Sequence, residues 1–324
     1  MLFLGCDSGA TKAAFMLVRD DATVLAHRVF PGVVLIAEGR DAYRAQMQSY
    51  LGELLREAGT QDITCAAFGL TEYGETRTAA QDMRAVFADV LKGTPCILVN
   101  DSVTGWCGAM GGKPGICIAA GTGSVAYGED ETGNGARAGG WSIRFADEGS
   151  AYWVAAQAVR AFFHQADGRM QKTLLYDHFM RLFAVQEPLH ACGAIEEYTR
   201  SGNYARVAKL QREVLTLYHK GDPCARQIYR EAAHWLSLLA ETIQRRLSFA
   251  QNRSVAVSYT GGLFRAGECI LEPLRQCVEQ KGFTLVPPRF GPLAGAVGYA
   301  ARGFMEYERL ERLMAQVDQC EANG

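Results

Sequence analysis

The sequence predicts a duplicated α/β protein, with two similar halves that enclose a cleft and a helical insert in the second half. The first observation is an apolar run that breaks at small residues and then resumes, at residues 1–18 and again at 115–128. The second is that strands and helices alternate after each of these hairpins. The third is a long stretch of helical spacing, from about 149 to 246. Such alternation predicts parallel strands with crossover helices, and ligands are expected in the cleft.

The first half spans residues 1–112 and is predicted to be a hairpin followed by two strand–helix units. The apolar runs of the hairpin are interrupted at Asp7–Lys12, where turn-forming residues replace apolar ones. A helix is indicated at 40–57 because Tyr43, Met47 and Leu54 fall on one face. The predicted strands are 1–6, 13–18, 24–30, 63–70 and 95–99, and the predicted helices are 40–57, 77–91 and about 100–111.

The second half spans residues 113–304 and repeats this plan around the insert. Asp167-Gly168 and Gly221–Pro223 are helix-breaking sequences that divide the insert. A charged segment at about 305–320 is expected to form a terminal helix that packs back on the first half. The other predicted elements are a hairpin at 115–128, insert helices at 152–163, 172–183, 204–218 and 225–247, strands at 254–259 and 283–286, and helices at about 267–280 and 292–304.

Composition limits the classes of partner and compartment. The chain has 324 residues and a net charge of -2, so it lacks the basic surface that phosphate-backbone binding draws on, and no nucleic-acid partner is expected. No apolar run approaches the roughly 20 residues of a membrane helix, and no signal-peptide pattern precedes the first strand, so we expect no membrane partner and a cytoplasmic location. The ten cysteines include no C-x-x-C pair, which favours reduced thiols over a zinc or iron–sulfur site.

Small residues gather at 119–124, Ala-Ala-Gly-Thr-Gly-Ser, between two extended runs. Glycine lets a ligand approach the main chain closely, and N–H groups with Thr and Ser hydroxyls suit phosphate oxygens. An ordinary surface hairpin has the same pattern, so this stretch alone does not decide between the two. The chain has no G-x-x-x-x-G-K-[ST] loop, and Gly121-Thr122-Gly123 lacks the third glycine of a dinucleotide or protein-kinase loop. A different phosphate cradle is needed.

Three motifs together carry a family resemblance. Asp7–Lys12, Gly121–Ser124 and Thr260–Gly262 resemble the phosphate-1, phosphate-2 and adenosine motifs of the actin-like ATPase, or ribonuclease H-like, fold. More narrowly, the sequences at 139–141 with 147–153, and at 291–296, resemble the family of N-acetylglucosamine kinases and BadF/BadG/BcrA/BcrD ATPases. The motifs stand in the family's order and cover most of the chain.

The resemblance implies an ATP site with Mg²⁺. Asp7, at a strand end, would help to hold hydrated magnesium, which takes few protein carboxylates; otherwise it is a turn-forming aspartate. Lys12 could add positive charge to the phosphate site. The residues that the resemblance assigns to ATP are Ser8, Gly9, Ala10, Thr11, Lys12, Gly121, Thr122, Gly123, Ser124, Gly261, Gly262 and Leu263.

Asp101 is the candidate general base and contacts the acceptor. It follows the strand at 95–99 and starts a helix, so it could equally be an N-cap residue. The two roles are compatible. In phosphoryl transfer through a loose transition state, such a base accepts the acceptor proton late, and positioning and charge neutralisation dominate the barrier.

The resemblance also implies that Gly140, Trp141, Asp147 and Glu148 bind the sugar. Carboxylates that accept hydrogen bonds from hydroxyl groups, beside an aromatic wall, can orient a polyol. The plainer interpretations are that Trp141 is a core aromatic and that Glu148 is a charge in a helix first turn.

The chain departs from the family pattern on the acceptor side. Sugar kinases of this family usually carry an Asn early in the segment after the third strand, whereas residues 30–36 have none. The family usually has Gly-Leu-small-Gly where this chain reads Gly69-Leu70-Thr71-Glu72. Ser142 and Ala146 stand at positions usually held by glycine.

The sequence therefore favours an ATP-dependent kinase for a hydroxyl of an amino sugar, with N-acetylglucosamine, a related N-acetylated hexosamine such as an N-acetylmuramate-like sugar, or free hexosamine as the acceptor. One alternative is a BadF/BadG-type ATPase that drives a partner protein, and another is a non-catalytic sensor of sugar and ATP. By analogy with the family, a homodimer is expected.

Overall fold

The computed structural model describes residues 1–199, 204–250 and 254–323. Its chain divides into two compact units, and each is described by itself. The first unit comprises residues 1–117 and 287–324, and the second comprises 118–286. Among the described residues, no helix combines the length and the apolar character needed to cross a bilayer.

The first unit is built on a five-stranded sheet of order β3-β2-β1-β4-β5. β2 runs antiparallel to β1 and β3, whereas β1, β4 and β5 are parallel. The carboxyl ends of these three parallel strands therefore share one edge. The strands are β1 (Leu2–Ser8), β2 (Lys12–Arg19), β3 (Val24–Pro31), β4 (Cys65–Leu70) and β5 (Cys96–Asn100).

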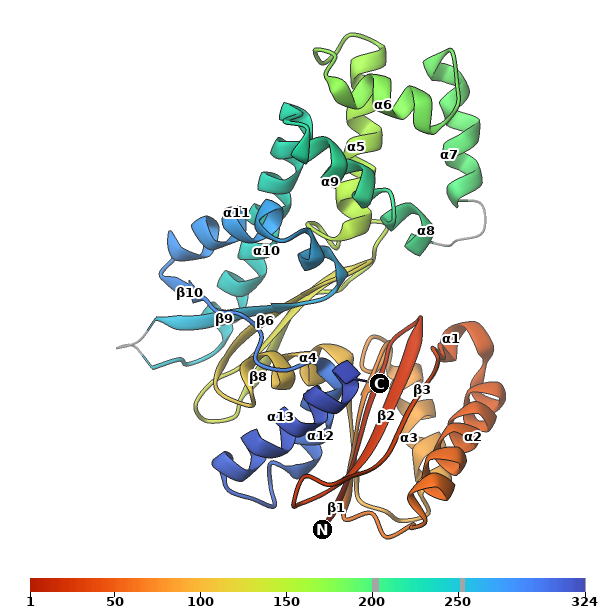
Figure 1. The fold of residues 1–324 in the computed structure, drawn as a ribbon, viewed down its shortest axis with the longest axis vertical. Helices are drawn as coiled ribbons and strands as arrows, with labels where there is room; N and C mark the ends of the chain where they lie inside the picture. The colour runs from red at the N-terminus through yellow and green to blue at the C-terminus, as the bar shows by residue number, and fades with distance from the viewer. Residues whose placement is uncertain (200–203, 251–253, 324) are drawn as a thin grey trace. The chain divides into compact units, whose positions relative to one another are not determined.

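Helices cover both faces of this sheet (Figure 1). One face packs on α2 (Arg40–Ala58) and α3 (Arg77–Leu91) through a core that includes Leu4, Phe15 and Phe68. A short helix that the sequence did not predict, α1 (Leu35–Glu38), lies beside α2. The other face packs on α4 (Asp101–Met110) and α12 (Pro292–Ala301).

Helix α12 belongs to the first unit, although the sequence grouped residues 292–304 with the second half. A Cβ on Gly5 would lie only 2.6 Å from the main-chain nitrogen of Val297, and one on Gly295 would overlap Gly108. Glycine at these positions lets α12 approach β1 and α4 closely. The unit boundary lies at 286/287 rather than at 304, because packing rather than chain order decides which unit a helix joins.

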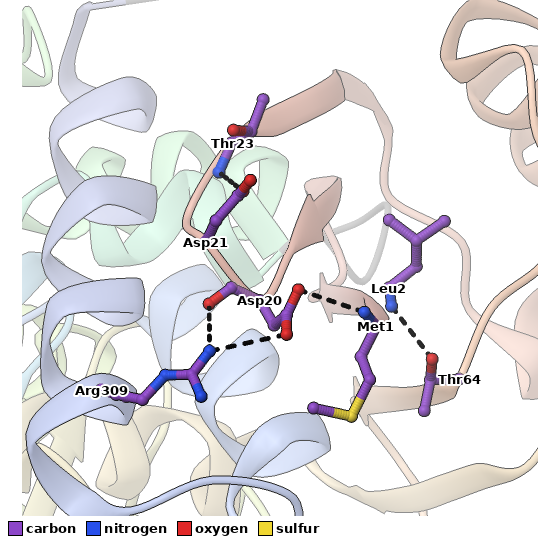
Figure 2. Close-up of polar contacts among 7 residues, drawn as sticks. All are labelled: Met1, Leu2, Asp20, Asp21, Thr23, Thr64 and Arg309. Carbon is purple, nitrogen blue, oxygen red and sulfur yellow. Dashed lines mark hydrogen bonds and ion pairs between the residues drawn. The ribbon is translucent and has the colours of Figure 1, made fainter.

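The terminal helix α13 (Tyr307–Asn323), expected at about 305–320, is also part of the first unit. Arg309 near its start pairs with the Asp20 carboxylate at 3.5 Å and donates to the Asp20 carbonyl at 3.4 Å (Figure 2). The same carboxylate accepts a hydrogen bond from the amino terminus of Met1 at 3.1 Å. These contacts fasten α13 to the turn between β2 and β3.

The second unit has the same strand order as the first. Read from its other edge, its five-stranded sheet is β8-β7-β6-β9-β10, with β7 and β8 antiparallel and β9 and β10 parallel. The sequence did not predict β8, because two glycines in five residues weaken a strand pattern. The strands are β6 (Gly115–Ala120), β7 (Ser124–Glu129), β8 (Gly135–Gly139), β9 (Val255–Thr260) and β10 (Phe283–Leu285).

Helix α10 (Pro223–Arg246) packs along β7 and β8 and carries the rest of the insert. The sequence predicted one helix at 204–218, but the structure has two, which are separated at Lys209-Leu210. It also missed the helical residues from Pro188 to Thr199. The remaining helices are α5 (Ala151–Ala166), α6 (Leu174–Leu182), the 3₁₀ helix η1 (Pro188–His190), α7 (Ala191–Thr199), α8 (Tyr204–Ala208), α9 (Gln211–His219), the 3₁₀ helix η2 (Gly262–Ala266) and α11 (Glu268–Glu279).

Candidate functional site

The shared edge of β1, β4 and β5 brings Asp7 and Asp101 together in the first unit. Ser8 pairs with Leu70 across β1 and β4, and Leu70 pairs with Asn100 across β4 and β5. Asp7 and Asp101 therefore stand at two strand ends that are separated by β4. Two carboxyl groups at one strand edge are suited to metal binding and proton transfer.

Asp7 is in surroundings that disfavour its negative charge. Burial raises the pKa of its carboxyl group to about 7, the charge of Asp101 adds to the rise, Lys12 opposes it, and Glu321 adds to it again. A carboxylate placed this way is stabilised by a neighbouring cation. Within the described part of the chain, no three His, Cys, Asp or Glu side chains gather as a metal site. Magnesium nevertheless fits Asp7, because this ion usually takes one or two carboxylates with waters and substrate phosphates.

Asp101 is the first residue of α4, but it is not the N-cap. The cap is Asn100, whose Oδ1 accepts a hydrogen bond from the Ser102 N–H at 3.2 Å. Asn100 also donates from Nδ2 to the carbonyl of Tyr73 at 3.3 Å. The sequence allowed Asp101 to be the N-cap, because Asn and Asp are both good caps. In the structure Asn100 has this role. Capping does not account for Asp101.

The turn between β1 and β2 is closed by a hydrogen bond from the Gly9 N–H to the Lys12 carbonyl at 3.0 Å. Ala10 and Thr11 are exposed at its tip, whereas the side chain of Ser8 is buried. The Lys12 ammonium lies 3.4 Å from a carboxylate oxygen of Glu321 in α13. The tip can therefore offer main-chain groups and one cation to a phosphate.

The turn between β6 and β7 contains the second predicted phosphate motif. The Gly121 N–H donates to the Gly123 carbonyl at 2.9 Å. Two N–H groups at the start of α5 brace the turn from outside: that of Ala151 donates to the Gly121 carbonyl at 2.9 Å, and that of Tyr152 donates to the Thr122 carbonyl at 3.4 Å. The turn is thus held rigidly by a helix N-terminus.

Gly261, of the predicted adenosine motif, lies directly against the end of β6. Its φ is +105°, and a Cβ there would come within 2.7 Å of the Ala120 carbonyl carbon. Gly262 is exposed and open, but the Leu263 side chain is fully buried, so only its main chain is available to a nucleotide. The open main chain at Gly262, beside the turn between β6 and β7, is compatible with a nucleotide lying on it.

Asp147 joins the predicted sugar loop to the phosphate turn. Its carboxylate accepts a hydrogen bond from the Trp141 N–H at 3.1 Å, and a Cβ on Gly123 would overlap one of its oxygens. Burial raises the pKa of Asp147, while the N–H groups of Ser142, Ser124 and Trp141 act to lower it. The observed contacts of Asp147 are thus with the loop's main chain, at a φ of +58°. They fix residues 140–148 against the phosphate turn.

Glu148 and Trp141 do not have the plainer roles that the sequence allowed. Glu148 precedes α5, whose N-cap is Ser150, so it is not in the helix first turn. Its carbonyl accepts a hydrogen bond from the Ser124 hydroxyl at 2.8 Å. Trp141 is 80% exposed, as is Phe145 at 88%, so neither is a core aromatic. Their exposure leaves the loop's aromatic groups available to a ligand.

A cavity of about 260 Å³ lies behind this loop within the second unit. Trp141, Asp147 and Glu148 line one side of it. Leu239 and Thr242 of α10 line another, with Trp235, Leu238 and Arg246 from the same helix. The sequence predicted this helix at 225–247 and assigned none of its residues to a site. Only the three- and four-residue spacing of its apolar side chains could have indicated a second wall of the site.

Comparisons with known proteins show the family of the chain. Residues 4–300 match the model of the BadF/BadG/BcrA/BcrD ATPase family. A curated N-acetylmuramic acid/N-acetylglucosamine kinase of Clostridium acetobutylicum is 28% identical over 265 residues, which cover 80% of this chain and 84% of that protein. An N-acetyl-D-glucosamine kinase of Dictyostelium discoideum is 25% identical over 81% of this chain and 85% of its own length.

Solved structures share the fold. A proposed N-acetylglucosamine kinase from Chromobacterium violaceum superposes with a TM-score of 0.71 at 23% identity, over 91% of this chain and 97% of that one. A ROK hexokinase from Thermus thermophilus gives a TM-score of 0.59 at 17% identity, over 94% and 99%. At these identities the likeness shows the fold alone, and the predicted α/β fold of two actin-like domains is confirmed.

Proposed function

Because the chain belongs to the BadF/BadG/BcrA/BcrD ATPase family, we propose that it is an ATP-dependent kinase that phosphorylates a hydroxyl of an amino sugar. The family resemblance that the motifs predicted is confirmed. The acceptor that we favour is N-acetylglucosamine or a related N-acetylated or free hexosamine, because both curated relatives described above are kinases of N-acetylated amino sugars.

A single observation carries the proposal: Asp147 binds the sugar loop to the phosphate turn. Its carboxylate occupies the place that a Cβ on Gly123 would need, and it accepts a hydrogen bond from the Trp141 N–H. A kinase must hold its acceptor and the terminal phosphate of ATP at a fixed separation, since correct placement supplies much of the rate enhancement. A loop that is locked to the phosphate turn provides that fixed separation within one rigid assembly.

The second unit supplies the nucleotide cradle. The turn Gly121–Ser124 offers main-chain N–H groups and the Thr122 hydroxyl to phosphate oxygens. Gly261 lets its main chain lie against the end of β6, and Gly262, which has nothing within 4 Å of its missing side chain, leaves the main chain open to base and ribose. In the first unit, the tip Gly9–Lys12 presents main-chain groups and the Lys12 charge, which also suit phosphate oxygens.

The first unit also supplies the two carboxylates. When bound, magnesium would neutralise phosphate charge, and Asp7 would hold it through its water shell. Asp101 accepts the proton of the acceptor hydroxyl. As that proton leaves, the hydroxyl oxygen forms a bond to the γ-phosphorus of ATP, the bond to the bridging oxygen breaks, and ADP departs with that oxygen.

The acceptor is oriented by the loop at 140–148 and the cavity behind it. Trp141 presents an apolar ring, and Glu148 presents a carboxylate that can accept hydrogen bonds from sugar hydroxyls. Asp147 contributes mainly by fixing this loop. Gly140, at a φ of +68°, allows the chain to turn into it.

The test is magnesium-dependent ADP release across a panel of hexoses, amino sugars, N-acetylated sugars and N-acetylmuramate. We expect strong stimulation by one amino-sugar class, and loss of that stimulation in Asp101→Asn. Asp62→Asn, at an exposed position before β4, is the matched control and should behave as wild type.

The other outcomes separate the alternatives. Steady ATP hydrolysis that is indifferent to every sugar would replace the kinase with an ATPase that drives a partner. ATP binding without any turnover would replace it with a sensor.

We further propose a homodimer, which rests on the family analogy. Light scattering should give twice the monomer mass, and a monomer at assay concentration would refute it.

A further inference from the structure

We propose that Glu72 is a positioning residue for the acceptor, because its carboxylate clamps the segment 33–38 at the strand edge that carries Asp7 and Asp101. The inference rests on the proposed kinase function. It unites two departures from the family pattern, the absent Asn after the third strand and the glutamate in place of a glycine after the fourth. In the structure the glutamate of the second departure contacts the segment in which the first departure occurs.

Glu72 lies in the loop that leaves β4 at this edge. The Thr71 N–H donates to the Ser8 carbonyl at 3.0 Å, which ties the loop to the end of β1. The Tyr73 carbonyl accepts from the Asn100 side chain at 3.3 Å, which ties it to the residue beside Asp101. Glu72 is thus fixed between the metal-holding and proton-accepting positions.

The Glu72 carboxylate caps α1 from outside the helix. It accepts a hydrogen bond from the Ile36 N–H at 3.2 Å, and the Leu35 N–H acts with that of Ile36 to lower the carboxyl pKa. The residue at the N-cap position, Val34, has no polar side chain and makes no cap hydrogen bond. The Val34 N–H instead reaches Glu38 at 3.5 Å. Two glutamates therefore satisfy N–H groups that a four-residue helix would otherwise leave unpaired.

The segment 33–38, which Glu72 holds, is also fixed by two buried side chains and by a close main-chain approach beside it. Val33 and Leu35 are buried in the first unit's core, whereas Ile36 is 64% exposed. Immediately before them, a Cβ on Gly32 would come within 2.5 Å of the Gly9 carbonyl oxygen at the phosphate hairpin. Glu72 thus adds one more attachment to the segment 33–38, which begins next to the hairpin of β1 and β2.

Glu72 adopts a backbone conformation that favours glycine. Its φ is +64°, a left-handed conformation that fits the glycine of the family pattern and is strained for a residue with a Cβ. Burial raises the pKa of its carboxyl group, and the two N–H groups oppose the rise. A residue that is both strained and desolvated is retained for the bonds that it makes.

The test compares Glu72→Gln, which keeps an accepting oxygen, with Glu72→Ala and Glu72→Gly, which lose it. With N-acetylglucosamine and ATP as substrates, the Ala and Gly variants should raise the KM for the sugar about 10-fold and leave the KM for ATP within about 2-fold. The Gln variant should stay within about 3-fold for both. Glu53→Ala, on the exposed side of α2, is the matched control.

Hydrogen exchange at the Leu35 and Ile36 amides gives a readout that needs no activity. Exchange should quicken about 10-fold in the Ala and Gly variants and remain slow in the Gln variant. An unchanged sugar KM, or equal rises in both KM values with a lower melting temperature, would overturn the positioning role.

Failure of the kinase function is distinguishable. A wild-type protein that turns over no sugar refutes the proposed function and, with it, the acceptor role of Glu72. The exchange data then show whether the clamp itself was also wrong.

Discussion

The two phosphate hairpins occupy the same place in two sheets of the same strand order, yet they are held in different ways. The hairpin of the first unit is surrounded by charge, with Asp7, Lys12 and Glu321 acting on one another. The turn Gly121–Ser124 contains no ionisable side chain and is braced by main-chain hydrogen bonds and by Asp147. The two units thus share a topology, but charged side chains surround the hairpin of the first and main-chain hydrogen bonds brace that of the second.

The strongest test of this difference is Asp101→Asn. Removing the proposed base should lower turnover about 10²–10⁴-fold and leave ATP binding nearly unchanged, because Asp101 is not among the residues proposed to bind the nucleotide. Single-turnover kinetics with a separate nucleotide-binding titration measure the two effects. Wild-type turnover in the variant would end the assignment of Asp101.

The corresponding test in the second unit adds the volume of a methyl group to the turn between β6 and β7. Gly123→Ala should reduce kcat/KM about 10–100-fold, because its Cβ would displace the Asp147 carboxylate and loosen the sugar loop. Gly121→Ala adds the same methyl group in the same turn but meets nothing within 4 Å, so its effect should be much smaller. Equal losses in the two variants would show that the contact with Asp147 is irrelevant.

Asp7→Asn should stabilise the protein in the absence of nucleotide and metal. Since the pKa of Asp7 is about 7 when folded and lower when unfolded, the folded state holds an extra proton between about pH 4 and 7, and wild-type stability falls as pH rises through that window. The variant should therefore gain about 1–3 kcal/mol at pH 8 and almost nothing near pH 4. Denaturant unfolding at both pH values measures this, and a gain that is larger in acid would contradict the electrostatic account.

The smallest effect is expected from Glu321→Gln. Its contact with Lys12 is exposed and is worth about 0–1 kcal/mol, so removing it should lower the KM for ATP by about 2-fold at low salt and less at high salt. Glu311→Gln, on the same helix, provides a comparison. An increase in the KM for ATP would show that Glu321 supports the site rather than competing for Lys12.

Most strands and helices could be predicted because their signals are local. The helix at Arg77–Leu91 was predicted at its observed ends, and the turns of the two hairpins were predicted from small residues between apolar runs. A local sequence pattern does not show which distant residue a side chain contacts. Asn100 and Asp101 are both good caps, and only the structure shows that Asn100 is used. The hydrogen bonds of Glu72 join positions 36 residues apart, so the sequence could mark it only as unusual.

The close packing of α12 on β1 has a consequence for the order of folding during synthesis. The second unit is one continuous stretch, 118–286, whereas the first needs residues from both ends of the chain. At about 5–20 residues per second, β1 leaves the ribosome on the order of 15–60 s before α12. Throughout that interval Gly5 faces no Val297, and only α4 can cover that side of the first sheet. The unit that is begun first is therefore the one completed last.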